Sequence, residues 1–428
     1  MELIQWLSQW KLVLTSNQLA RNMRTVLLAL AATLAAGASA PRFVRIKGQE
    51  FVSTATGAPV VLSGPNVVVK ASPYLPAVSG TTHCHDMINA TCSAAGTCTS
   101  CETFNEADVA LLKSQGRNMI RLSVVWAGAQ PRDEDKLDPA FLARLHALLN
   151  LTDKSGINVI LDNHGDMVGT AGCGNGVPMW FQQKAPGVAA LIGKPLTTDL
   201  PFSLIPNLVV SKTGGYDHCG SNATMWAAHA GDPNYNMLNE CCLAMNSGGN
   251  PAGLGWTSIS QKTMDYMVGY DGLHQSKDMA GRASFVRYWK LLAEAVVDHP
   301  SAVGCELMNE PMSINRRGMY ETWQASAEAI LAIIPDMSIA VCDTGEGAVL
   351  PGWIYSRWVD LPYLTPSHAT VMWMKASSNL FYAWHYYGNP KTPADAVTNA
   401  LAVQKVRLRC SGSAVAASFY IEKASRVY

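Results

Sequence analysis

The sequence VGCELMNEP at residues 303–311 decides the fold, together with the runs on either side of it. Residues 303–307 are largely apolar and predict a buried strand. The flanking residues 283–297 and 320–334 repeat apolar side chains at the spacing of an amphipathic helix, and residues 338–342 predict the next strand. Strands that alternate with helices in this way predict a parallel sheet covered by helices.

The same alternation continues towards both ends of the chain. A hairpin is predicted at residues 43–52, and the further strands are predicted at residues 60–62, 119–125, 158–161, 380–384 and 414–419. The further helices are predicted at residues 105–114, 138–153 and 392–406. About seven strand–helix steps in one domain favour an α/β protein of the (β/α)8 TIM-barrel type over a doubly wound sheet.

One long region breaks this rhythm. Residues 165–279 are rich in Gly, Asn, Pro and Cys and are too long for an ordinary connection. We therefore expect a long insertion after the third strand, on the face where barrel enzymes build their sites. Its tryptophans either line a glycan cleft or pack within a lid, and they are Trp180, Trp226 and Trp256.

Residues 1–40 predict an N-terminal extension followed by a signal peptide, which leaves residues 41–428 as the barrel. An apolar run at residues 26–36 precedes small residues at 38–40 that resemble a cleavage site. A signal anchor is the alternative, but the run is shorter than the about 20 apolar residues that span a bilayer. We expect a secreted or lumenal protein, in an endomembrane or lysosome-like compartment for example, with no transmembrane span in the mature chain.

Eleven cysteines suit an oxidising compartment, where disulfides persist. Four of them cluster in one segment: Cys84, Cys92, Cys98 and Cys101. His83 and His85 lie beside this cluster, but the signal sequence favours disulfides over a zinc site. Cys305 and Cys342 lie in apolar strand-like runs and are expected to be buried free thiols. Secretion would also permit N-glycosylation, for which acceptor triplets begin at Asn89, Asn150 and Asn222.

The charge balance and the absent motifs exclude several function classes. Lys plus Arg and Asp plus Glu both number 32, so the net charge of zero does not attract nucleic acid or an anionic membrane. The sequence has no phosphate-binding or dinucleotide-binding glycine motif, no Gly-x-Ser-x-Gly and no His-Glu-x-x-His. We expect no cofactor, no metal and no nucleic-acid partner, and a neutral glycan or glycolipid is the partner that fits best.

Polar side chains lie within or directly after several predicted strands, towards the end where (β/α)8 enzymes place their active sites. These residues are Arg121, Asp162, His164, Asn309, Glu310, His385 and Tyr387. Each has a structural alternative: Glu310 before Pro311, for example, suits the first turn of a helix. Their common position at strand ends favours instead a site with Asn, His, Tyr and Arg around one carboxylate.

Glycoside hydrolysis uses such a set of groups. A carboxylic acid protonates the leaving oxygen, and a second carboxylate attacks the sugar or activates water. We predict Glu310 as the acid and Asn309 as the partner of a sugar hydroxyl. His385 and Tyr387 are expected to orient the second carboxylate.

Five segments in this order resemble glycoside hydrolase family 5, the cellulase family of the retaining clan A. They are residues 59–66, 118–121, 162–164, 308–311 and 385–387. His-Gly-Asp at residues 164–166 and GNGVPMW at residues 174–180 further resemble the endoglycoceramidase-like branch, which cleaves glycans from glycolipids.

The resemblance implies roles for individual residues. It makes Glu310 the catalytic acid/base and Asn309 the partner of the sugar 2-hydroxyl, with Arg121 beneath the nucleophile. The residues that it assigns to subsite −1 are His164, His385 and Tyr387. The implied activity is hydrolysis of O-glycosidic bonds in β-linked glycans or glycolipids by a retaining two-carboxylate mechanism.

The sequence departs from the family pattern at its C-terminal end. The family's nucleophile is a Glu at the end of the seventh strand, where Ser418 stands in this sequence before Phe419. Glu422 follows too far along the chain to replace it. The sequence then ends at Tyr428, so we expect a barrel truncated before its eighth βα unit, as a truncated or mis-spliced gene model would give.

Three interpretations of function follow from these observations. The first is an active retaining β-glycosidase. The second is a catalytically impaired protein that still binds glycans or glycolipids, which Ser418 favours. The third is a metal-dependent barrel hydrolase that uses His164 and His385, which is disfavoured because barrel metal sites recruit more His and Asp ligands than appear here.

Overall fold

The computed structural model describes residues 41–69, 74–79, 103–132, 135–165, 168–169, 174, 176–192, 257–269, 279–313, 315–342, 367–383 and 415–416. The predicted signal peptide, most of the expected insertion and the helix expected at residues 392–406 lie outside them. Within these ranges, no helix is both long enough and apolar enough to cross a membrane.

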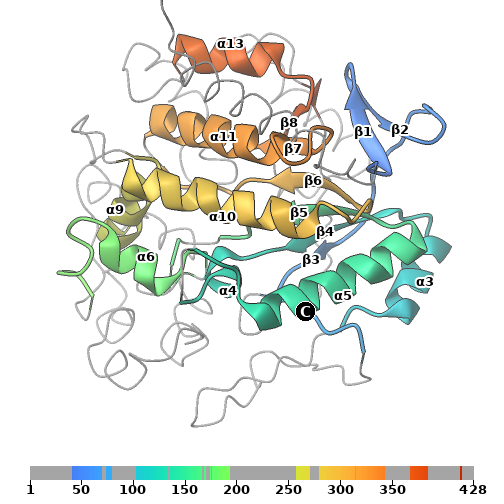
Figure 1. Ribbon diagram of the computed structural model, residues 1–428, viewed down its shortest axis with the longest axis horizontal. Coiled ribbons are helices and arrows are strands. Elements are labelled where there is room, and N and C mark those ends of the chain that lie inside the picture. Colours follow the sequence, from blue (N-terminus) through green and yellow to red (C-terminus); the bar gives the residue numbers. More distant parts are fainter. Residues whose placement is uncertain are drawn as a thin grey trace, which may run out of the picture. The chain divides into compact units, whose positions relative to one another are not determined.

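A parallel sheet of seven strands forms the centre of the fold, and its strand order follows the sequence (Figure 1). The strands are β3 (Asn66–Val67), β4 (Met119–Ser123), β5 (Asn158–Asp162), β6 (Ala302–Glu306), β7 (Ser338–Val341), β8 (Leu380–Tyr382) and β9 (Val415–Ala416). Each strand pairs in parallel with the next one along the chain. Sequential parallel order with helices between the strands is the TIM-barrel arrangement, so the predicted α/β fold class is confirmed.

Helices connect these strands and cover one face of the sheet. They are α3 (Glu106–Ser114), α4 (Trp126–Ala129), α5 (Pro139–Ser155), α6 (Met179–Lys184), α9 (Ser258–Met267), α10 (Ala280–Val296), α11 (Arg316–Leu331) and α13 (His368–Ala376). In Figure 1, α10, α11 and α13 lie side by side in sequence order, and α10 contacts α11 as α11 contacts α13. The layering places the helices outside and leaves the other face of the sheet as the barrel interior.

Local signals explain where the helices begin. Asn105 forms a capping box before α3, because its side chain accepts from Ala107 N and the side chain of Asp108 accepts from Asn105 N. Asp138 caps α5, because its side chain accepts from Ala140 N and Phe141 N, and Pro139 occupies the first turn. The predicted bounds of these helices are therefore confirmed within a few residues.

The expected first strand at residues 60–62 is wrong. Val60 N instead donates to Phe51 O at 2.8 Å, and Val52 forms an antiparallel bridge with Pro59. This segment therefore pairs with the hairpin of β1 (Val44–Lys47) and β2 (Glu50–Ser53), which the sequence did predict. The chain reaches the parallel sheet at Ser63, whose main-chain oxygen accepts from Asn118 N and Met119 N, and β3 then pairs with β4 from Asn66.

Helix α9 was missed by the sequence interpretation for a physical reason. All its residues from Ser258 to Met267 are buried except Lys262, and they include polar residues such as Gln261 and Thr263. Most of its residues are polar although they are buried, so the composition of this segment resembles that of a loop. Helix α13 was also missed, although Ser367 caps it by accepting from Thr370 N at 3.2 Å.

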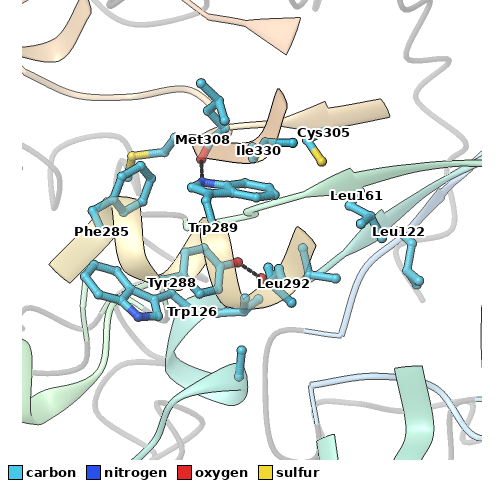
Figure 2. Packing of buried hydrophobic residues seen from close by; sticks show 14 of the residues in the cluster. Leu122, Trp126, Leu161, Phe285, Tyr288, Trp289, Leu292, Cys305, Met308 and Ile330 are labelled. Atoms are coloured by element: carbon cyan, nitrogen blue, oxygen red, sulfur yellow. Dashed lines mark hydrogen bonds between the residues drawn. The ribbon is translucent and has the colours of Figure 1, made fainter. Parts of the chain in front are cut away.

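Aromatic side chains of the outer helices fill the space against the sheet. Figure 2 shows Phe285, Tyr288 and Trp289 of α10, which belong to the same buried cluster as the strand residues Leu122 and Leu161. The ring of Trp126 on α4 stacks on Tyr288 with centroids 5.4 Å apart. Burial of such large apolar surfaces is the main favourable term in folding.

Three of these aromatic residues also hold the chain just beyond a strand. Tyr288 donates its hydroxyl to Val124 O, and Trp289 donates its indole N–H to Leu307 O at 3.2 Å (Figure 2). Trp323 donates to Cys342 O at 3.0 Å. Because buried carbonyls need a partner, these bonds fix the residues that follow β4, β6 and β7.

A smaller cluster fills the inner face of the sheet. It contains Met119, Ile160, Val303 and Phe381, together with Val44 of the hairpin. Phe51 of the hairpin meets Phe381 edge-on, with ring centroids 5.3 Å apart. The β1–β2 hairpin therefore packs into the barrel interior through its apolar side chains.

A polar cluster joins the end of α5 to the loop after α10. Asp153 accepts from Ser301 N at 2.8 Å and bonds His299 Nδ1 at 2.7 Å, while His299 Nε2 lies 2.9 Å from His146 Nδ1. Arg42 donates to the main-chain oxygen of His299. Burial acts to raise the pKa of Asp153, but the hydrogen bonds from His299 and Ser301 outweigh this effect and lower the pKa below its ordinary value.

We predict that Asp153→Asn destabilises the protein by about 1–2 kcal/mol at pH 7, because the charged acceptor is lost. A lowered pKa in the folded state contributes stability above the unfolded pKa of about 4, and this contribution disappears as pH falls. The difference in the free energy of unfolding between variant and wild type should therefore be smaller at pH 3.5 than at pH 7. Urea unfolding at both pH values measures this difference.

Asp135→Asn is the matched control, because Asp135 forms an exposed ion pair with Arg287 at 2.9 Å. It should change the free energy of unfolding by less than about 0.5 kcal/mol. An equal loss for the Asp153 variant at both pH values would contradict the assigned role of Asp153.

Candidate active site

Arg121 of β4 lies at the centre of a buried polar network on the inner face of the barrel. Its Nε donates to Glu306 Oε2 at 2.6 Å, and its Nη2 donates to Glu306 Oε1 at 2.8 Å. Its Nη1 lies 2.9 Å from Asp162 Oδ2. A guanidinium that bonds one carboxylate through two nitrogens is held in one orientation, so Arg121 is rigid.

The same guanidinium reaches residues that follow neighbouring strands. Its Nη2 also donates to Asn309 Oδ1 at 2.8 Å, just beyond β6. Its Nη1 lies 3.3 Å from His164 Nδ1 and 3.4 Å from Asn66 Oδ1. Because the amide oxygen of Asn309 faces Arg121, its NH₂ group is the donor on the opposite side.

Asp162, the last residue of β5, pairs with His164 just beyond the strand. His164 Nδ1 lies 2.6 Å from Asp162 Oδ2, and the Asp162 side chain is fully buried. A carboxylate at this distance favours the proton on Nδ1, which leaves Nε2 on the far side of the ring. His164 is thereby oriented for contact with a ligand through Nε2.

The buried charges shift one another's proton affinity. Burial acts to lower the pKa of Arg121, but the carboxylates of Asp162 and Glu306 raise it above its ordinary value. The guanidinium therefore stays charged. Burial raises the pKa of Asp162 above its ordinary range, and the nearby Glu306 adds to this effect. The charges of Arg121 and His164 offset part of the rise.

Glu310 follows Asn309 with an unusual backbone. Its φ of 38° lies in the left-handed region, which non-glycine residues adopt rarely and mostly at functional sites. No helix begins here, since α11 starts at Arg316 behind its cap Asn315. The alternative interpretation of Glu310 as a residue of a helix N-terminus is therefore wrong.

Main-chain bonds fix the segment that carries Asn309 and Glu310. Asn309 N donates to Asn163 O at 3.0 Å, and Asn163 N donates to Glu306 O at 3.1 Å. The ends of β5 and β6 are thus tied together where the polar side chains converge. Glu310 is partly buried and Asn309 is buried, as expected for residues at the edge of an internal site.

The structure brings together Arg121, His164 and Asn309 in one network and places Glu310 beside it. The remaining predicted residues, His385 and Tyr387, lie outside the described residues, as do Ser418 and Glu422. Within the described part of the chain, no group of three or more His, Cys, Asp and Glu side chains is arranged to hold a metal ion.

The sequence interpretation missed Glu306 and Cys342 as parts of this site. Glu306 is fully buried, and its Oε1 accepts from Cys342 Sγ at 3.2 Å. A signal was present, because Glu306 is the one ionisable carboxylic acid within the apolar run 303–307. Cys305 and Cys342 are both free and buried, as predicted.

The segment 174–180 supports the site from outside. An added Cβ on Gly176 would lie 2.4 Å from Gly165 Cα, so only glycine allows this close approach beside His164. Trp180 donates its indole N–H to Gln130 O at 2.7 Å and meets Trp126 edge-on. Trp180 therefore packs against α4, while Trp226 and Trp256 lie outside the described residues.

Comparisons with known proteins find one matching family and several relatives. The model of the family described as cellulase (glycosyl hydrolase family 5) matches residues 85–188 and 255–410. The endoglycoceramidase of Hydra vulgaris is 24% identical over 258 residues, which cover 59% of this chain and 37% of that protein. The endoglycoceramidase of Cyanea nozakii is 25% identical over 297 residues, which cover 67% of this chain and 46% of that protein.

Solved structures of similar proteins include endo-glycoceramidase II from Rhodococcus sp., at 17% identity and a TM-score of 0.46. That comparison covers 83% of this chain and 64% of the other. The chain spans less than half the length of the two curated relatives named above.

We predict that Arg121→Met lowers the free energy of unfolding by more than about 3 kcal/mol at pH 7, because Asp162 and Glu306 lose their buried counter-charge. Unpaired buried carboxylates have a raised pKa in the folded state, so the folded variant binds more protons than its unfolded state. Its stability should therefore rise as pH falls from 7 towards 5. Denaturant unfolding across this range measures both effects.

Arg287→Met serves as the control, since Arg287 pairs with Asp135 on the surface. It should lose less than about 1 kcal/mol. If the Arg121 variant were as stable as this control, the network would not depend on its central cation.

Proposed function

Because the chain belongs to the cellulase family of glycosyl hydrolases, family 5, we propose that it hydrolyses O-glycosidic bonds of β-linked glycolipids with Glu310 as the acid/base. The observation that carries this proposal is the pair of Asn309 and Glu310 beyond β6. Arg121 holds the amide of Asn309, and Glu310 has a left-handed backbone beside it. In barrel enzymes of this type the ends of the strands carry the catalytic groups.

The proposed chemistry assigns a separate role to each group. Glu310 protonates the glycosidic oxygen as the bond to the sugar breaks. The NH₂ group of Asn309 donates to the sugar 2-hydroxyl, a contact that strengthens as positive charge develops on the ring. His164 presents Nε2 to a further hydroxyl because Asp162 occupies its other nitrogen. In the second half of a retaining reaction, Glu310 accepts a proton from the attacking water.

A retaining mechanism also needs a nucleophilic carboxylate. Glu306 and Asp162 are buried and bond Arg121 through their oxygens, so we assign both to holding the arginine. The family resemblance puts the nucleophile at the position of Ser418, which follows β9 in the sequence. Ser418 therefore favours a second candidate function, which is binding of glycolipid without turnover.

The substrate class is proposed from the relatives. The two curated relatives from Hydra vulgaris and Cyanea nozakii both carry the name endoglycoceramidase. The segment 174–180 that resembles that branch packs directly against the loop of His164 through Gly176 and Gly165. Replacement of Gly176 by any larger residue would displace Gly165, the neighbour of His164.

We predict that Glu310→Gln lowers kcat on lactosylceramide in detergent micelles by about 10²–10⁴-fold, because the amide cannot donate the proton. The loss should be much smaller on an aryl β-cellobioside with an acidic phenol as leaving group, since that bond breaks without protonation. Released sugar and released phenol measure the two rates.

Glu294→Gln is the matched control, because Glu294 is an exposed residue of α10 that pairs with Lys290. It should keep full activity. A folded wild type that binds lactosylceramide micelles without turnover would support the binding function instead. A folded wild type that shows neither turnover nor binding of the micelles would contradict both candidate functions.

A further inference from the structure

Glu306 is a buried acid that the proposed reaction does not use directly. It lies in β6, four residues before Glu310, and its side chain has no exposed surface. Its two oxygens bond Arg121 through Nε and Nη2, at 2.6 and 2.8 Å. Both nitrogens that Glu306 engages belong to one edge of the guanidinium, so the plane of Arg121 is set by this carboxylate.

The bond from Arg121 to Asn309 depends on that plane. Nη2 carries two hydrogens. It donates one to Glu306 Oε1 and the other to Asn309 Oδ1, each at 2.8 Å. Rotation of the guanidinium away from Glu306 would break the bond to Asn309. The direction of the Asn309 amide is therefore coupled to Glu306 through a single nitrogen.

Cys342 fixes the other end of this series of bonds. Its thiol donates to Glu306 Oε1 at 3.2 Å, and Trp323 holds its main-chain oxygen at 3.0 Å. Burial and the nearby Glu306 carboxylate raise the pKa of Cys342 well above its usual range, so the thiol keeps its proton. Cys342 thus acts as a neutral donor, which places Glu306 without adding a charge.

We propose that Glu306 is a positioning residue that, through Arg121, aims the Asn309 amide at the substrate, and that Cys342 holds Glu306 in place. This inference rests on the proposed function, because the aimed contact is the one beside Glu310. The alternative is that Glu306 is only a counter-ion that stabilises the fold. The two differ in whether Asn309 changes when Glu306 is altered in a folded protein.

The test compares Glu306→Gln, Cys342→Ala and Cys342→Ser in the full chain. Gln has nearly the same shape as Glu but replaces one accepting oxygen with a donor, so it cannot receive both Arg121 hydrogens. The Ser variant keeps a donor at position 342 and the Ala variant removes it. If Glu306→Gln does not fold, Cys342→Ala carries the test through the same series of bonds.

The first readout does not depend on turnover. NMR of protein labelled with ¹⁵N-arginine and ¹⁵N-asparagine follows the Arg121 Nε–H and the Asn309 side-chain NH₂, assigned from Arg121→Lys and Asn309→Asp. We expect at least about 10-fold faster hydrogen exchange at Arg121 Nε and a shifted Asn309 amide in Glu306→Gln, because the buried bonds that protect them are lost. Cys342→Ala should show a smaller change of the same kind, and Cys342→Ser should resemble wild type.

The second readout is kcat on lactosylceramide. We expect about a 100-fold loss in Glu306→Gln, the cost of a contact misplaced by roughly 1 Å, with KM altered less than kcat. Glu321→Gln is the control, because Glu321 pairs with Arg282 at 3.2 Å outside this network. It should leave kcat and both NMR signals unchanged.

The outcomes separate the inference from the proposed function. Unchanged Asn309 signals in a folded Glu306→Gln would overturn the inference, even if the variant were less stable. A wild type without turnover would refute the proposed hydrolysis, and the NMR signals would then decide the inference alone. The inference would be supported if the Arg121 and Asn309 signals change in Glu306→Gln and Cys342→Ala but not in Cys342→Ser.

Discussion

The whole site depends on one ion pair, the bidentate contact of Arg121 with Glu306. A buried guanidinium is stable only where its charge is met, and here Glu306 and Asp162 meet it from two neighbouring strands. In return, the arginine orients Asn309 and lies within reach of His164. Removing either partner would leave an unpaired charge in the interior, so the pair holds both the fold and the geometry of the candidate site.

The barrel makes this contact possible. Arg121 and Glu306 are far apart in sequence, but β4 and β6 both pair with β5 and place these residues on its two sides. From outside, Tyr288, Trp289 and Trp323 donate to the main chain just beyond β4, β6 and β7. The apolar layer between helices and sheet therefore supports the positions of the polar groups inside, and packing and function are coupled through the strand ends.

Periodicity and strand-end chemistry carried the prediction of the fold and of Arg121, His164, Asn309 and Glu310 as neighbours. The sequence predictions were wrong or incomplete where a residue pattern arose from a contact other than the expected one. Val60 to Leu62 looked like a barrel strand because it is apolar, but it pairs with the hairpin. Helix α9 consists mostly of polar residues that are nevertheless buried, so its composition resembles that of a loop. Glu306 was passed over because a lone acid within an apolar strand reveals its role only when the opposing Arg121 is in place.

The pair of Arg121 and Glu306 thus directs the Asn309 amide towards a sugar bound beside Glu310. The most direct measurement is a crystal structure of the chain with lactose, a disaccharide that carries the 2-hydroxyl and a glycosidic oxygen. We expect Asn309 Nδ2 within hydrogen-bond distance of a sugar 2-hydroxyl, the Glu310 carboxyl facing the anomeric oxygen, and Arg121 still bonded to Glu306. Lactose bound away from Asn309, or an Arg121 turned away from Glu306 in that complex, would contradict it.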